Sequence, residues 1–304
     1  MRRYLFMAIA SALFGTIGIC VKLIGNSVPP MAITFYRFFF GFIFLLCVTP
    51  FIDKNIFRVT KNDIRDYFVI GLLFSVTLPL FTLANVYAPV QNVVLLDSTT
   101  PFFVLGIAYV FLKEKITRTK TVAFAIAMAG IVIINPLQSG QYQLGNTLAI
   151  LAAATYGVLV VEMRKEDENH GIGDVMWFLL FATLLSSPIP FIYGLGDLSA
   201  AWPYLFFMGF LGTGLAYLLY NISLERIEAE ISTIMTMIIS PIVAISLAFF
   251  ILGEKLEINT MAGGAILIIS AIYLQLHKRE LGERSSGHHP MRGHRQKCMK
   301  SCRK

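Results

Sequence analysis

Long apolar runs separated by short polar connections make up almost the whole chain. An apolar run of about 18 residues or more is long enough to cross a bilayer as a helix. A soluble core helix could explain one such run, but it does not explain ten in series. The pattern therefore predicts an all-α integral membrane protein with ten transmembrane helices. The predicted spans cover residues 4–25, 30–51, 67–87, 91–112, 119–136, 145–163, 174–194, 203–221, 231–252 and 259–276.

The composition supports a membrane protein, and most of the net charge lies in one segment of the chain. Hydrophobic residues make up 56% of the 304 residues and charged residues only 14%, whereas soluble domains have about 25% charged residues. The net charge of +7 comes almost entirely from residues 281–304. This segment predicts a disordered basic tail in the cytoplasm, with a metal site or a lipid-binding patch as alternatives. No spacing in it matches a zinc module, so we expect no metal, no cofactor and no nucleic-acid partner.

The distribution of Lys and Arg predicts the orientation of the chain. These residues collect in short loops on the cytoplasmic side of a membrane. With the N-terminus inside, 22 of the 25 Lys and Arg residues fall in cytoplasmic segments. Lys22 and Lys255 would lie outside, and Arg37 would lie within the membrane. We therefore expect a multi-pass protein of the cytoplasmic (inner) membrane with both termini in the cytoplasm.

The two halves of the chain share a sequence pattern. The pairs that align at shifts of 140 or 142 residues include Pro101–Pro241, Ala108–Ala248, Leu112–Leu252, Glu114–Glu254 and Gly15–Gly157. Each half, residues 1–140 and 141–280, holds five predicted helices, and an odd number makes the second half enter the membrane from the opposite side. The chain is therefore predicted to be two inverted five-helix repeats, a recurring construction of secondary transporters.

Short motifs accompany this repeat. They are "ALFG" (12–15) and "ATYG" (154–157), a proline in the fourth helix of each half, and the closing "LKEKIT" (112–117) and "LGEKLE" (252–257). On these motifs, residues 1–277 resemble the EamA-type permeases of the drug/metabolite transporter superfamily. The resemblance implies a basket-like helical permease that moves small metabolites such as amino acids, often outward. It also implies a central cavity lined mainly by helices one, three, four, six, eight and nine. Asp97 departs from the family, which usually has a small or apolar residue there.

Arg37 and Asp97 are the two full charges well inside predicted spans. A charge at the centre of a membrane helix costs about 2.5–3.5 kcal/mol on insertion scales, so such groups are candidates for function. Both lie roughly 10 Å from the same membrane face, since a helix rises 1.5 Å per residue. We expect them to pair, because an isolated charge there would tend to neutralise. A structural salt bridge, a substrate or proton site, and separate snorkelling of each group are the three interpretations.

Further candidates for the cavity wall follow from helix spacing. Thr100 and Pro101 share a helix face with Asp97. Pro101 and Pro241 each free a backbone carbonyl one turn earlier, which must face protein or a wet cavity in lipid; a kink that serves packing alone is the alternative. Other candidates, whose side chains are equally at home in cores and interfacial belts, are Phe14, Tyr156, Trp177, Tyr217 and Asn221.

The sequence contains no catalytic motif. It has no Walker loop, no paired His/Glu metal spacing and no nucleophile elbow, so we do not expect an enzyme. The function predicted is a secondary transporter (a permease or exporter) that moves a small metabolite such as an amino acid by alternating access, with proton coupling as an option. A passive channel, or a membrane-embedded enzyme acting on a lipid or small polar substrate, is the alternative. Expected partners are the substrate and the bilayer, with the chain as a monomer or homodimer.

Overall fold

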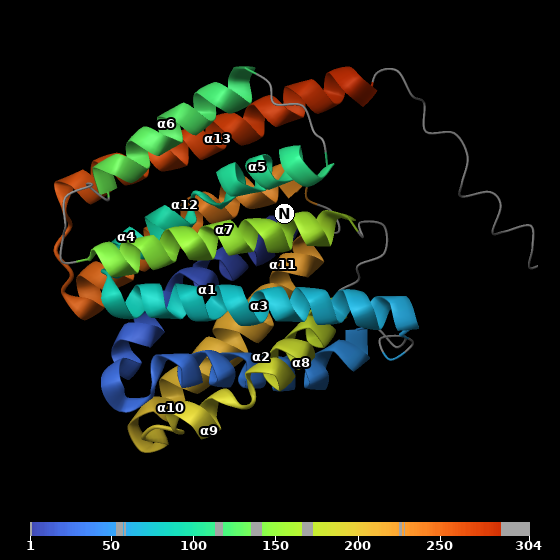
Figure 1. Ribbon diagram of the computed structural model, residues 1–304, viewed down its shortest axis with the longest axis vertical. Coiled ribbons are helices and arrows are strands. Elements are labelled where there is room, and N and C mark those ends of the chain that lie inside the picture. The colour runs from blue at the N-terminus through green and yellow to red at the C-terminus, as the bar shows by residue number, and fades with distance from the viewer. Residues whose placement is uncertain are drawn as a thin grey trace, which may run out of the picture.

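A computed structural model describes residues 2–52, 57, 59–112, 118–134, 142–165, 173–224, 227 and 229–286. These residues form helices and connections, with no β-strand among them. Predicted features that involve Glu114 or residues 287–304 lie outside this set. The helices run side by side in a layered bundle (Figure 1).

The helices follow the predicted spans closely. In the first half they are α1 (Arg2–Ile24), η1 (Gly25–Ser27), α2 (Pro30–Ile52), α3 (Lys61–Tyr87), α4 (Val90–Asp97), α5 (Thr100–Leu112) and α6 (Arg118–Ile134). In the second half they are α7 (Gln143–Lys165), α8 (Asp174–Ser186), α9 (Ile189–Tyr193), α10 (Leu198–Phe206), η2 (Phe207–Leu215), α11 (Ala216–Leu224), α12 (Ala229–Leu247), η3 (Ala248–Leu252) and α13 (Ile258–Ser286).

The described segments contain eight helical stretches long and apolar enough to cross a membrane, together with two shorter apolar helices. The shorter ones are Thr121–Ile134 and Ile258–Leu274, and they coincide with the fifth and tenth predicted spans. All ten predicted runs therefore correspond to apolar helices, and the prediction of an all-α membrane protein is confirmed. The last helix continues to Ser286, past the start of the segment predicted as a tail.

The fourth span is broken near its middle. α4 ends at Asp97 and α5 begins at Thr100. Pro101 cannot donate a hydrogen bond to the Asp97 carbonyl one turn earlier. The Thr100 hydroxyl donates to that carbonyl instead, at 2.8 Å, so the freed acceptor is satisfied inside the protein, as membrane burial requires. The repeat partner Pro241 lies within an unbroken helix, α12, so the break distinguishes the first half from the second.

The contacts between helices show which helices lie at the edges of the bundle and which lie at its centre. α6 and α13 lie against each other along one edge, and α2, α8 and α10 form the opposite edge (Figure 1). α1, α3, α7 and α12 lie between these edges and contact one another in pairs: α1 with α12 and α3 with α7. Other helices therefore cover the central helices on both sides, and a cavity between the central helices can be isolated from lipid.

Small residues allow the central helices to approach closely. A Cβ atom added at Gly15 of α1 would lie 2.6 Å from the Ser240 carbonyl oxygen of α12. One added at the repeat partner, Gly157 of α7, would lie 2.9 Å from the Phe103 Cβ of α5. The shared glycines of the two first-helix motifs therefore act in helix packing, which is the usual use of such residues in membrane bundles.

Candidate functional site

A cavity of about 300 Å³ lies inside the bundle, a size within the range of small-ligand sites. The six spans expected to line it all contribute: α1, α3, the broken span α4–α5, α7, α11 and α12. Arg37 from the second span and Leu274 from the tenth also contribute. Because the lining comes from both halves of the chain, movement of one half against the other would change the shape of the cavity.

Eight of the ten residues predicted for the site line this cavity: Phe14, Arg37, Asp97, Thr100, Pro101, Tyr156, Tyr217 and Pro241. The structure does not place Trp177 or Asn221 in the lining. The Trp177 ring stacks on Tyr67, with ring centroids 6.1 Å apart. The Asn221 amide donates back to the Tyr217 carbonyl of its own helix at 2.8 Å. Their helices were predicted correctly, but these side chains point to other neighbours.

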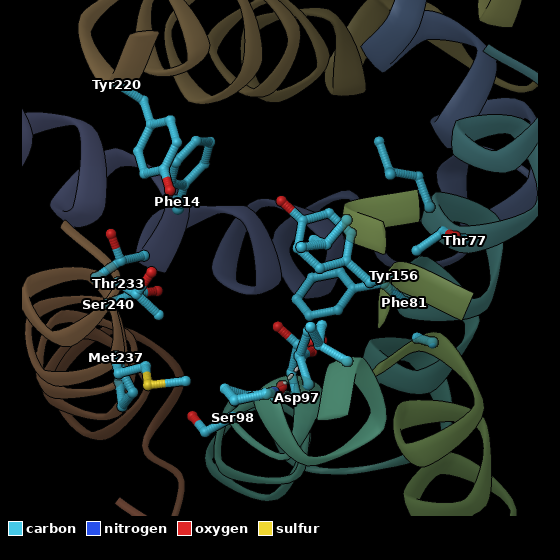
Figure 2. A pocket seen from close by; sticks show the side chains of 18 of the residues that line it. Phe14, Thr77, Phe81, Asp97, Ser98, Tyr156, Tyr220, Thr233, Met237 and Ser240 are labelled. Atoms are coloured by element: carbon cyan, nitrogen blue, oxygen red, sulfur yellow. Dashed lines mark hydrogen bonds between the residues drawn. The ribbon is translucent and has the colours of Figure 1, made fainter. Parts of the chain in front are cut away.

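Residues related by the repeat meet in the cavity. The repeat-related pairs among the lining residues are Phe14–Tyr156, Thr77–Tyr217, Asp97–Met237, Thr100–Ser240 and Pro101–Pro241. Figure 2 shows Asp97 and Tyr156 on one side of the open space and Met237 and Ser240 on the other. Equivalent positions of the two halves thus face one site, and the lone charge in the pair Asp97–Met237 makes that site electrostatically asymmetric.

Asp97 lies at the end of α4, where the fourth span is interrupted. Its side chain is half-buried and faces the cavity beside Ser98. Within the described chain, its carboxylate makes no hydrogen bond and no ion pair. A carboxylate inside the bundle is therefore free to accept a hydrogen bond or a charge partner from the cavity.

Arg37 is almost fully buried, with 4% of its surface exposed. Its Nε donates to the Thr213 hydroxyl of η2 at 2.9 Å. Its Nη1 is buried and has no hydrogen-bond partner among the described residues. The direct pairing expected with Asp97 does not form in this part of the chain, because Thr213 holds the guanidinium on the α2–η2 side while Asp97 projects from the fourth span. The two charges share one cavity without contact.

Several lining residues were missed by the sequence analysis. Tyr220 lies one turn beyond Tyr217, and Thr233, Thr236 and Ser240 recur along α12 upstream of Pro241. Tyr220 follows the predicted Tyr217 at i+3, and Thr233, Thr236 and Ser240 follow one another at i, i+3 and i+7, so the spacing was present in the sequence. Thr213 does not line the cavity, and no spacing in the sequence could indicate its bond to Arg37, which is 176 residues away.

A polar cluster lies at one end of the bundle, around the start of α4. The Glu254 carboxylate accepts a hydrogen bond from the Val90 N–H at 3.0 Å, satisfying a donor that the first turn of a helix leaves free. The Gln91 amide donates to the Lys255 carbonyl at 2.7 Å, and the Lys22 ammonium donates to the Val86 carbonyl at 3.4 Å. None of these residues lines the cavity. On the fourth span the cavity lining begins at Asp97, which lies about 10 Å along the helix from Val90.

One carboxylate outside the spans serves as a comparison for Asp97. Asp197 is exposed and precedes α10, where its side chain accepts hydrogen bonds from the hydroxyl and the backbone N–H of Ser199. These bonds hold the pKa of Asp197 below its usual value, because they favour the charged form. In the described residues, no group of three or more His, Cys, Asp or Glu side chains could hold a metal ion.

Similar proteins are found by sequence and by structure. An uncharacterized transporter of Clostridium kluyveri is 25% identical over 292 residues, covering 88% of this chain and 91% of that protein. An S-adenosylmethionine uptake transporter of Rickettsia conorii is 22% identical over 254 residues, covering 83% and 85%. A protein of known crystal structure superposes with a TM-score of 0.66 at 17% identity, covering 92% of this chain and 98% of its own; this likeness shows the fold alone.

The family assignment rests on nearly the whole chain. The sequence profile of the EamA-like transporter family matches residues 1–135 and again residues 143–276. Two successive matches agree with the repeated pattern, and the helical bundle with a central cavity agrees with the architecture that the motifs implied. The resemblance noted from the motifs is therefore confirmed: the chain belongs to the EamA-like transporter family and is a membrane transporter, not an enzyme.

Proposed function

We propose that the protein is a secondary transporter that carries a small amine-bearing metabolite, such as an amino acid, by alternating access. The observation that carries this proposal is the Asp97 carboxylate, which faces the central cavity without a hydrogen bond or ion pair from the described residues. An acid at this depth is costly unless a partner offsets its burial. A substrate ammonium would form a charge-assisted hydrogen bond with it.

The aromatic lining supports the same substrate chemistry. Phe14 and Tyr217 pack edge to face, with ring centroids 5.1 Å apart, and Tyr156 and Tyr220 also line the cavity. Aromatic faces attract cations and provide apolar area for a side chain. Some relatives are named S-adenosylmethionine uptake transporters, so S-adenosylmethionine, which carries both an ammonium and a sulfonium, joins the amino acids as a candidate substrate.

The polar cluster supports alternating access. It ties α4 to the segment after η3 at one end, and Asp97 in the cavity lining lies about 10 Å further along the fourth span. We infer a state that is closed at the Glu254 end, and a second state that opens there when the two halves, residues 1–140 and 141–280, exchange conformations. Inverted repeats make such an exchange symmetric about a central site.

Counter-flow in proteoliposomes tests the transport proposal. Vesicles loaded with unlabelled compound are diluted into labelled compound, using the twenty L-amino acids and S-adenosylmethionine one at a time. A carrier exchanges label inward and accumulates it transiently above the outside concentration; a channel only equilibrates it. Transient accumulation of at least one compound is expected with the protein and not with empty vesicles. Simple equilibration, or no uptake of any compound, overturns the proposal.

The predicted orientation has its own test. With the native cysteines replaced, single cysteines are introduced at Asn26, between α1 and α2, and at Thr60, the N-cap of α3. With both termini in the cytoplasm, a membrane-impermeant thiol reagent should label the Asn26 variant in intact cells and the Thr60 variant only after lysis. Labelling of the Thr60 variant in intact cells would reverse the orientation and place the Glu254 end in the cytoplasm.

A further inference from the structure

We propose that Arg37 is the subsite for a carboxylate of the substrate, and that Thr213 positions its guanidinium for that role. The inference deepens the proposed function and rests on it: with Asp97 binding an amine, the cavity would select a zwitterion of the amino-acid type over a simple amine.

The hydrogen bonding of Arg37 is incomplete among the described residues. A guanidinium carries five N–H donors in a planar fork that fits a carboxylate bidentately. Arg37 is 4% exposed and lines the cavity, yet its buried Nη1 finds no partner in the described part of the protein. Leaving a charged donor buried and unpaired costs more than leaving a neutral one. A carboxylate within the cavity would supply the missing acceptor.

Thr213 holds the Nε side of the guanidinium. Thr213 is fully buried, and its hydroxyl donates to the Met208 carbonyl five residues earlier at 3.0 Å. Since the single hydroxyl hydrogen is used there, the oxygen presents a lone pair to the Arg37 Nε at 2.9 Å. The bond to a carbonyl five residues back belongs to the π-helical segment η2, a kind of helix distortion that is frequent at functional sites.

Tight packing between η2 and α2 fixes this arrangement. A Cβ atom added at Gly209 of η2 would lie 2.5 Å from the Phe40 Cβ of α2, and one added at Gly214 would lie 2.7 Å from the Phe44 ring. The backbone of η2 is therefore pressed against α2 on both sides of Thr213. With little freedom in the backbone, the Nε–Thr213 bond orients the guanidinium and leaves its Nη1 edge for a ligand, which is the preorganisation that favours binding.

The charges of Asp97 and Arg37 are separated within the cavity. Asp97 and Arg37 line one cavity but form no direct ion pair. A pair in contact would satisfy itself and leave no site for a charged substrate. Two opposite charges held apart match the ammonium and carboxylate of a zwitterion, and a molecule that lacks either group would leave one buried charge unpaired. Sites of this kind reject an analogue that lacks one polar group more strongly than apolar pockets reject a missing methylene.

The test compares each amino acid with its amide. Each compound that gives counter-flow with the wild-type protein is competed with its own carboxamide, which keeps the ammonium and removes the carboxylate. We expect the amide to compete at least about ten-fold more weakly, since losing one charge-assisted bond is worth about that factor. Arg37→Gln should bring the amino acid and the amide to similar potency, and Arg37→Lys should restore only part of the preference.

Thr213 variants separate a positioning role from a structural one. Thr213→Val keeps the shape and removes the hydroxyl, and it should lower the affinity for the amino acid more than for the amide; Thr213→Ser should restore the preference. Thr183→Val is the matched control, because the buried Thr183 hydroxyl donates to the Leu179 carbonyl of its own helix, makes no other hydrogen bond among the described residues, and does not line the cavity. Equal loss for both compounds in Thr213→Val would assign Thr213 a structural role and overturn its positioning role.

The outcomes distinguish this inference from the proposed function. Absence of counter-flow for every compound overturns the proposed function and the inference with it. Counter-flow in which the amide competes as well as the amino acid overturns the carboxylate subsite alone and leaves the transporter intact. This comparison uses only wild-type protein, so it decides the question even if an Arg37 variant fails to fold.

Discussion

Asp97→Asn is expected to lower counter-flow of the amino-acid substrate about ten-fold or more while the protein still folds. The substitution keeps the size of the side chain and removes its charge. Since no hydrogen bond or ion pair of the Asp97 carboxylate is present in the described chain, its loss leaves no protein partner newly unpaired. What the substitution removes is the charge-assisted hydrogen bond to the substrate ammonium, which contributes about 1.5–3 kcal/mol to binding.

Flux driven by an imposed pH gradient provides the second readout for Asp97. If a proton and the substrate ammonium compete for this one carboxylate, exchange and pH-driven flux both fall in Asp97→Asn. If the carboxylate only carries protons, the variant keeps exchange and loses pH-driven flux. Full wild-type exchange and full pH dependence in Asp97→Asn would remove Asp97 from the site.

Two further variants complete the Asp97 experiment. Adding Arg37→Leu to Asp97→Asn would restore transport if the two residues were merely a structural salt bridge, because a buried charge left without its partner is the main cost of breaking one. We expect no restoration, since the guanidinium is bonded to Thr213 and not to Asp97. Asp197→Asn, at an exposed acid outside the cavity, should leave exchange unchanged.

Gly15→Ala is expected to destabilise the fold by about 1–3 kcal/mol, the usual cost of overpacking a tight interface. The added Cβ would lie 2.6 Å from the Ser240 carbonyl oxygen and 3.2 Å from the Val243 Cβ. A backbone oxygen cannot move aside without shifting α12, which carries part of the cavity wall. Thermal unfolding of the purified protein in detergent should therefore show a lower midpoint, and counter-flow should fall with it.

Gly106→Ala is the matched control for this packing argument. Gly106 also lies within a helix, α5, but a Cβ atom there would meet nothing within 4 Å. Alanine is favoured over glycine in a helix by roughly 0.5–1 kcal/mol, so Gly106→Ala should leave the unfolding midpoint unchanged or raise it. Equal midpoints for the two alanine variants would show that the α1–α12 contact tolerates an extra methyl group and would contradict the prediction.

The helices were predictable because their cause is local. Each span needs enough consecutive apolar residues to cross the bilayer and must satisfy its backbone within itself, so run length alone located them. The break in the fourth span was partly predictable as well. Pro101 indicated that a backbone carbonyl one turn earlier would lack its donor, and the hydroxyl that bonds to this carbonyl belongs to Thr100, the residue next to Pro101. Where cause and effect lie within one turn, the sequence contains both.

The site could be predicted only as a set of helices and a few residues. The repeat indicated which spans meet, and its related pairs, such as Phe14–Tyr156, do line one cavity. It did not indicate rotation: Trp177 was expected in the cavity, and its ring instead stacks on Tyr67. The rotation of a helix depends on which neighbours its small residues admit, and those neighbours come from distant parts of the chain.

The sequence by itself determined the class of the protein, its spans, its repeated pattern and the presence of two membrane-embedded charges, because each depends on residue type and spacing alone. Only the tertiary structure decided what those charges contact. Arg37 bonds to Thr213, 176 residues away, and Glu254 bonds to the start of α4, 164 residues away. Such contacts depend on helix rotation, on a π-helical segment and on glycine interfaces, and residue spacing within one helix encodes none of these. As a result, the two charges expected to form an ion pair instead face one cavity separately.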